Sequence, residues 1–164
     1  MDALSTRIKS LTRIVKNLTI SGAHWLEIGT NLQNEMYLFG DVNMDGEVSA
    51  DDANEIMSIL SGDVQETAMN FVLGNTDFDD GLKYIDASIV YEAFSGTRTL
   101  PFVYATAFEY QDAAVGDVVR AEFNNANGTI PTYAYVAKAG VIGIYSNVKI
   151  TTDIAGSIRI LKMG

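Results

Sequence analysis

The sequence predicts an α+β protein built from three consecutive parts, and each part is predicted by its own pattern. Residues 1–34 begin with apolar residues at helical spacing, residues 35–98 contain a repeated acidic loop–helix unit, and residues 99–164 are rich in β-branched and aromatic residues between turns. We therefore expect an N-terminal amphipathic or coiled-coil helix, a small all-α module and a C-terminal antiparallel β-sandwich or barrel.

The first part has apolar residues at alternating spacings of four and three. Its members are Leu4, Ile8, Leu11, Val15 and Leu18. This spacing is typical of a coiled-coil seam, although the same residues also fit an amphipathic helix that packs on its own domain. As a coiled coil, the segment would be a self-association and anchoring helix that forms a dimer or trimer. A short strand carrying Trp25 is expected to follow it.

The central part contains an internal repeat with a period of 34 residues. The segment "GDVNMDGEVSADDANEIMSILSG" (40–62) aligns with "GNTDFDDGLKYIDASIVYEAFSG" (74–96). In each copy an acidic loop precedes apolar positions at helical spacing, so each copy is expected to form a loop and a short helix. Helices this short are marginal alone, so we expect the two to pack against each other.

Negative charge is concentrated in this repeat. Residues 35–92 hold 14 of the 21 acidic residues and one base, Lys83. Carboxylates at this density repel each other unless solvent or a cation lies between them. An acidic chain without a basic stripe is also a poor nucleic-acid ligand, so no nucleic-acid partner is expected.

The first loop has the ligand spacing of an EF-hand calcium loop. With Asp41 as position 1, side-chain or carbonyl oxygens stand at positions 1, 3, 5, 7 and 12, and Gly46 at position 6 permits the sharp turn. Oxygen ligands select calcium or magnesium over softer metals, and binding should be coupled to folding. The predicted ligands are Asp41, Asn43, Asp45, Glu47 (through its carbonyl) and Asp52.

The second loop offers a similar set with two departures. Its predicted ligands are Asn75, Asp77, Asp79, Gly81 (through its carbonyl) and Asp86. Asn75 replaces the leading aspartate, and Asp80 replaces the glycine at position 6. Either the turn shifts so that Gly81 becomes the hinge, or Asp80 adopts a positive φ. We predict a second Ca²⁺ site here; the alternative is that this copy keeps its fold without an ion.

The run "GDVNMDGEVSADD" resembles the calcium loop of dockerin modules, in which position 12 is aspartate. The resemblance covers about residues 38–97 and implies two loop–helix units, related by pseudo-twofold symmetry, around two calcium ions. It also implies a non-catalytic role, because dockerins bind cohesin domains through helix residues and loop positions 10 and 11. Those positions are Ala50-Asp51 and Tyr84-Ile85 here, unlike the Ser-Thr pairs of cellulosomal dockerins.

The whole arrangement also resembles a phage head-fibre or capsid-decoration protein. The run "AYVAKAGVIGIYSNVKITTDIAGSIRIL" is similar to the β-rich ends of such virion proteins. This resemblance implies a structural protein of the virion surface, made in the host cytoplasm, whose partners are its own copies and a capsid protein. The alternative is a cohesin-binding component of a bacterial surface or polysaccharide-degrading complex, extracellular or at the cell surface. We expect neither a signal peptide nor a membrane span, and hence no membrane partner.

The sequence does not predict an enzyme. It has no cysteine, its single histidine is His24 beside Trp25, and it contains no "GxSxG", "HExxH" or Gly-rich phosphate loop. The pairs Asp51-Asp52 and Asp79-Asp80 could act as glycosidase carboxylates, but they fall within the cation loops. Five tyrosines of the third part could stack on a glycan, although the preference of strands for tyrosine also explains them: Tyr104, Tyr110, Tyr133, Tyr135 and Tyr145.

Overall fold

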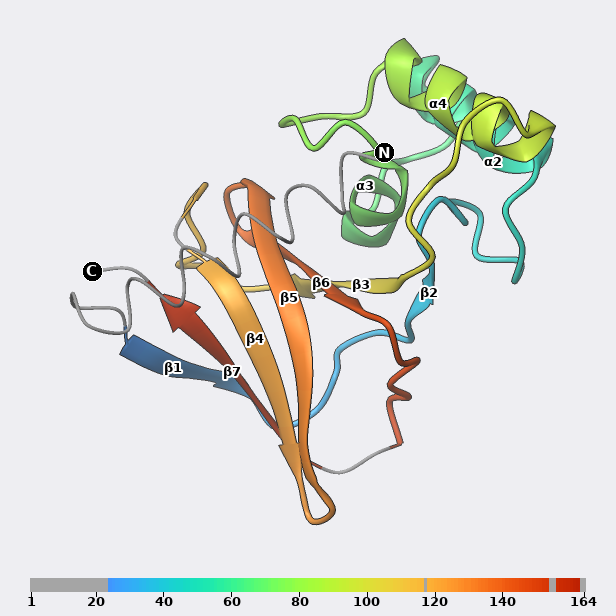
Figure 1. Ribbon diagram of the computed structural model, residues 1–164. Coiled ribbons are helices and arrows are strands. Elements are labelled where there is room, and N and C mark those ends of the chain that lie inside the picture. The colour runs from blue at the N-terminus through green and yellow to red at the C-terminus, as the bar shows by residue number, and fades with distance from the viewer. Residues whose placement is uncertain (1–23, 117, 154–155, 163–164) are drawn as a thin grey trace.

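The structure, a computed structural model, describes residues 24–116, 118–153 and 156–162. Its strands form one antiparallel seven-stranded sheet in the order β1-β7-β4-β5-β6-β3-β2 (Figure 1). The strands are β1 (His24–Gly29), β2 (Tyr37–Leu38), β3 (Tyr104–Glu109), β4 (Val118–Asn125), β5 (Gly128–Lys138), β6 (Val141–Ser146) and β7 (Ser157–Lys162).

Three helices in the described part of the chain lie together at one end of the molecule (Figure 1). They are α2 (Ala50–Leu60), α3 (Ala68–Gly74) and α4 (Tyr84–Ser95). Helices α2 and α4 lie where the two copies of the repeat place them, whereas α3 was not predicted. Within the described ranges, none of the helices has the length and apolar character needed to cross a membrane.

The predicted fold class is wrong, because the described chain is mainly β and its sheet is not built from the C-terminal part alone. Strand β1 pairs with β7 and strand β2 pairs with β3, so strands from before the helical region complete both edges of the sheet. The local pattern of residues 99–164 marks strands but not their distant partners. The predicted N-terminal coiled-coil helix falls on residues 1–23, which lie outside the described residues.

Strand β5 joins the two halves of the sheet. Residues 128–132 pair with β4, and residues from Tyr133 onward pair with β6. Apolar side chains from both halves meet in one core, which includes Phe123 of β4, Ile144 of β6 and Ile158 of β7. Since side chains alternate along a strand, the neighbours of these residues point to the opposite face.

The helical region covers that opposite face over β3, β5 and β6. Ala105 and Ala107 of β3 and Tyr145 of β6 form the sheet side of this interface. The small alanine side chains allow close approach of α3, whose Met69 sulfur lies 3.2 Å from the Ala107 amide nitrogen. The helical side of the cluster consists of Phe39, Met69, Phe71, Val72, Leu73, Phe78 and Leu82. This interface fixes the acidic loops beside the sheet.

A separate small core joins α2 to α4. It contains matching residues of the two repeats, Ala53 with Ala87 and Ile56 with Val90, together with Val42. Because these pairs are 34 residues apart, the same apolar positions of each copy face the partner helix. The packing of α2 on α4 therefore brings the two loops into one compact unit.

Candidate metal centre

The structure gathers three carboxylates in each acidic loop. In loop 1 (41–52) they belong to Asp41, Asp45 and Asp52, and in loop 2 (75–86) to Asp77, Asp79 and Asp86. Within each set, one oxygen from every residue lies within 4.8 Å of the others. All six carboxylates were predicted as ligands from the sequence.

Loop 1 is closed by backbone donors that point at Asp41. This carboxylate is fully buried, and it accepts hydrogen bonds from the Asp45 amide (3.2 Å) and the Gly46 amide (2.9 Å). Gly46 reaches this position with φ at +102°, a conformation that glycine adopts readily. The predicted hinge at Gly46 is therefore present in the structure.

The other two predicted ligands of loop 1 lie at its exposed side. The Asn43 side chain donates to Asp45 Oδ2 at 3.3 Å, and the Asn43 Oδ1 accepts from the Asp45 amide at 3.3 Å. The Glu47 amide donates to Asp45 Oδ1 at 3.1 Å, while the Glu47 side chain is exposed. Asp45 is thus oriented from both sides.

The position-12 carboxylates join each loop to its helix. Asp52 accepts from the Ser49 amide (2.7 Å) at the start of α2 and from the Asn43 amide (3.1 Å) within the loop. Asp86 likewise accepts from the Lys83 amide (2.9 Å) and the Thr76 amide (3.0 Å). Each aspartate is therefore both a capping residue and a member of the acidic cluster.

Burial disfavours the ionised form of the Asp52 and Asp86 carboxylates. Desolvation raises the pKa of Asp52 and of Asp86 from the ordinary 3.8 to about 6, and the negative charges of their loop neighbours add to the effect. Desolvation also raises the pKa of Asp41. At neutral pH the two loops therefore hold closely spaced, poorly solvated negative charges, which a bound cation would stabilise.

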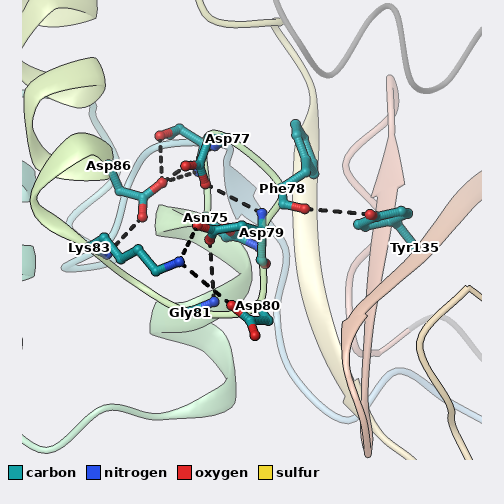
Figure 2. Close-up of polar contacts among 10 residues, drawn as sticks. Asn75, Asp77, Phe78, Asp79, Asp80, Gly81, Lys83, Asp86 and Tyr135 are labelled. Atoms are coloured by element: carbon teal, nitrogen blue, oxygen red, sulfur yellow. Dashed lines mark hydrogen bonds and ion pairs between the residues drawn. The ribbon is translucent and has the colours of Figure 1, made fainter.

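Loop 2 contains a buried oxygen without a partner. Asn75 is 2% exposed, and its Nδ2 donates to the Asp79 carbonyl at 2.7 Å, which holds the carboxamide inside the loop (Figure 2). The Asn75 Oδ1 has no hydrogen-bond partner. An unsatisfied buried acceptor costs about 1–3 kcal/mol, and a cation bound at this oxygen would remove that cost. The oxygen is therefore a candidate ligand at position 1.

The turn of loop 2 corrects both sequence-based alternatives. Neither Asp80 nor Gly81 has a positive φ; the left-handed residue of this loop is Phe78, with φ at +59°. The Asn75 Nδ2 of loop 2 donates a hydrogen bond to the Asp79 carbonyl. The equivalent residue of loop 1 is Asp41, whose carboxylate has no proton to donate. The Gly81 amide donates to Asp79 Oδ1 at 3.3 Å, as Glu47 does in loop 1.

Phe78 ties loop 2 to the sheet. Its ring stacks on Phe39 at 5.7 Å and meets the Tyr135 ring edge-on at 5.8 Å, while its carbonyl accepts from the Tyr135 hydroxyl at 3.4 Å (Figure 2). Phe78 itself is 3% exposed. Loop 2 is thus part of the interface between the helical region and the sheet, a role that its position in the motif does not indicate.

Lys83 belongs to the same loop and directly precedes α4. Its Nζ is 2.8 Å from Asp79 Oδ2 and 3.7 Å from Asp80 Oδ1. Partial desolvation acts to raise the pKa of Asp79, but the contacts with Lys83 and with the Gly81 amide outweigh it, so the pKa falls. Loop 2 therefore already contains one positive charge beside a predicted ligand.

Helices α2 and α4 present an exposed apolar surface, which we call the α2–α4 face. It consists of Met57, Tyr84, Tyr91 and Phe94, and the Phe94 ring lies against the Tyr91 ring. A shallow groove lies on it, lined by Ala53 and Met57 of α2 and by Tyr84, Ala87 and Tyr91 of α4. Exposed aromatic clusters of this kind are typical of protein interaction surfaces.

The tyrosines of the strands contribute to packing. Tyr133, Tyr135 and Tyr145 lie against the helical region, and Tyr104 and Tyr110 pack at the core between the two halves of the sheet.

Comparison of the chain with protein-family models, with curated proteins and with solved structures finds no match. The fold and the loops together define a mainly β protein that carries a duplicated acidic loop–helix unit.

Proposed function

We propose that this chain is a non-catalytic assembly protein whose loop–helix unit binds two Ca²⁺ ions and whose α2–α4 face docks on a protein partner. The observation that carries the proposal is the convergence of three carboxylates in each of two equivalent loops, with Asp41, Asp52 and Asp86 fully buried. Buried carboxylates of like charge are stabilised by a cation between them.

The ligand chemistry favours calcium. Every candidate ligand is a carboxylate, amide or carbonyl oxygen, and the chain has no cysteine. Calcium accepts six to eight such oxygens at flexible distances, whereas magnesium demands near-octahedral geometry and retains its water. In loop 2 the unpartnered Asn75 Oδ1 supplies an oxygen beyond the three carboxylates.

Calcium titration of the metal-free full chain by isothermal titration calorimetry tests the proposal. We expect two bound ions, with one lost in each of the variants Asp45→Ala and Asp79→Ala. Neither Asp45 nor Asp79 is buried, so both variants should keep their fold. Magnesium chloride is the competing ion, and Asp63→Ala, an exposed residue outside both loops, is the matched control. Absence of heat at millimolar Ca²⁺, with an unchanged melting curve, would disprove the metal sites.

The α2–α4 face supports the assembly role. Tyr84, Tyr91 and Phe94 are each more than half exposed, and aromatic side chains contribute strongly to protein interfaces. A capsid protein on a virion surface is the proposed partner, and a cohesin domain is the alternative. Calcium-dependent binding to purified cohesins, abolished by Tyr91→Ser combined with Phe94→Ser, would favour the alternative. The double variant should melt close to the wild-type temperature, because both rings are about half exposed.

A further inference from the structure

The two loops differ in charge at position 9. In loop 2 this residue is Lys83, and its equivalent in loop 1 is Ser49. The Lys83 Nζ contacts Asp79 Oδ2 at 2.8 Å, and Asp79 is one of the three converging carboxylates of loop 2. Residues 41–52 contain no lysine or arginine. Loop 1 therefore has no positively charged side chain of its own.

We propose that Lys83 is a tethered competitor of the divalent ion, so that loop 2 binds Ca²⁺ more weakly than it would without this side chain and fills after loop 1. The inference rests on the proposed function of the loops as calcium sites. The Lys83 ammonium already neutralises part of the negative charge of Asp79, and it would repel a cation that binds at the same carboxylate. Calcium binding at loop 2 therefore has to overcome this repulsion or displace the Lys83 Nζ from Asp79 Oδ2.

A neighbouring acid can receive the displaced ammonium. Asp80 Oδ1 already lies 3.7 Å from the Lys83 Nζ, its side chain is 83% exposed, and it is not among the converging carboxylates. The Lys83 side chain is 55% exposed, so it can move from Asp79 toward Asp80 without disturbing the core. Exposed pairs of this kind are weak, so displacement weakens calcium binding but does not prevent it.

The ammonium group does not complete the site. Asn75 Oδ1 remains without a partner although Lys83 is nearby, and the Asn75 side chain is almost fully buried. Figure 2 shows Asn75 within the loop, close to Asp79 and Lys83. Lys83 therefore reduces the charge of the loop while an inward oxygen ligand stays unused. If Lys83 only neutralised the acidic loop, no unpartnered oxygen would be expected inside it. The unpartnered Asn75 Oδ1 favours a metal site with which Lys83 competes.

Site-resolved calcium titration by ¹H–¹⁵N NMR tests the proposal on the full chain. The Gly46 amide reports loop 1 and the Gly81 amide reports loop 2, because each donates to a carboxylate of its own loop. With calcium chloride as the probe, Lys83→Met should tighten binding at loop 2 by about threefold to tenfold and leave loop 1 unchanged. Lys83→Arg keeps the positive charge and should retain the weaker affinity.

Two controls separate this role from a general effect of charge or of folding. Lys138→Met removes a positive charge that pairs with Glu66 and contacts no carboxylate of either loop, and it should alter neither affinity. The cap of α4 survives in the Lys83 variants, since the Lys83 backbone amide, not the side chain, donates to Asp86. Equal loop 2 affinity in wild type and Lys83→Met would overturn the inference and leave the calcium sites standing. If the Gly46 amide signal shifts with calcium but the Gly81 amide signal shifts in neither protein, the inference is also overturned. If neither glycine signal shifts in any variant, the proposed function itself is wrong.

Discussion

Calcium should reverse the pH dependence of stability, because Asp52 and Asp86 ionise with difficulty in the metal-free protein. Raising a pKa from 3.8 to about 6 corresponds to about 3 kcal/mol of unfavourable free energy for each ionised carboxylate. Well below pH 4 the folded and unfolded states both hold the proton, and well above pH 6 both have lost it. Between these limits the folded state binds more protons, so the free energy of unfolding falls as the pH rises.

Bound calcium favours the ionised carboxylates and should change the sign of this slope. At a free concentration of about 100 times Kd, one ion adds about 3 kcal/mol to the free energy of unfolding, and this gain grows as the carboxylates ionise. For a chain of this size, 3 kcal/mol shifts the melting temperature by about 10 °C. Without calcium the melting temperature should fall between pH 4 and pH 6, and with millimolar calcium it should rise.

Differential scanning calorimetry of dialysed protein, without a chelator, measures both slopes. Asp52→Asn and Asp86→Asn should each flatten the calcium-free slope, because each removes one carboxylate with a raised pKa. Asp63→Asn, at an exposed acid outside the loops, should leave it unchanged. A calcium-free melting temperature that rises through this window, or loop variants with the wild-type slope, would refute the reasoning.

Four substitutions test the packing and the turns, each by urea unfolding of the metal-free protein. Phe78→Ala should lower the free energy of unfolding by about 3–5 kcal/mol, because it removes a buried ring from the interface with the sheet; a loss below 1 kcal/mol would contradict this packing. Gly46→Ala should cost about 1–2 kcal/mol because φ is +102°, whereas Gly81→Ala, with open space and no positive φ, should stay within about 0.5 kcal/mol; equal effects would refute the assigned turns. Asn70→Ala should cost about 1–3 kcal/mol, since the buried Asn70 amide donates to the Val42 carbonyl at 3.0 Å, and a neutral result would exclude that bond.

The local features of the acidic loops could be predicted from the sequence. The spacing from Asp41 to Asp52 and the glycine at position 46 follow from the repeat itself, and the structure places the carboxylates together. Each loop is a contiguous stretch whose hydrogen bonds are short in sequence, so the pattern contains most of the information. Ser49 and Asp52 likewise form a capping box within four residues of each other.

The long-range features could not be predicted in this way. His24 pairs with Lys162 across almost the whole chain, and no local pattern specifies which strand an edge strand joins. The burial of Phe78 depends on the docking of the helical region on the sheet. The short helix α3 begins at a capping box formed by Thr67 and Asn70, which is a local signal present in the sequence.

The pairing of β2 with β3 has a topological consequence. Leu38 is the register partner of Tyr104, and the Phe39 amide donates to the Val103 carbonyl at 2.9 Å, so the chain leaves the sheet and returns to it at the same place. The whole helical region is therefore an insertion at the tip of a β-hairpin. Replacing it with a tight turn would leave every strand connected in the same order, and would uncover the apolar surface around Ala105 and Tyr145. A transplanted copy of the helical region would therefore need a host surface that matches its buried apolar side.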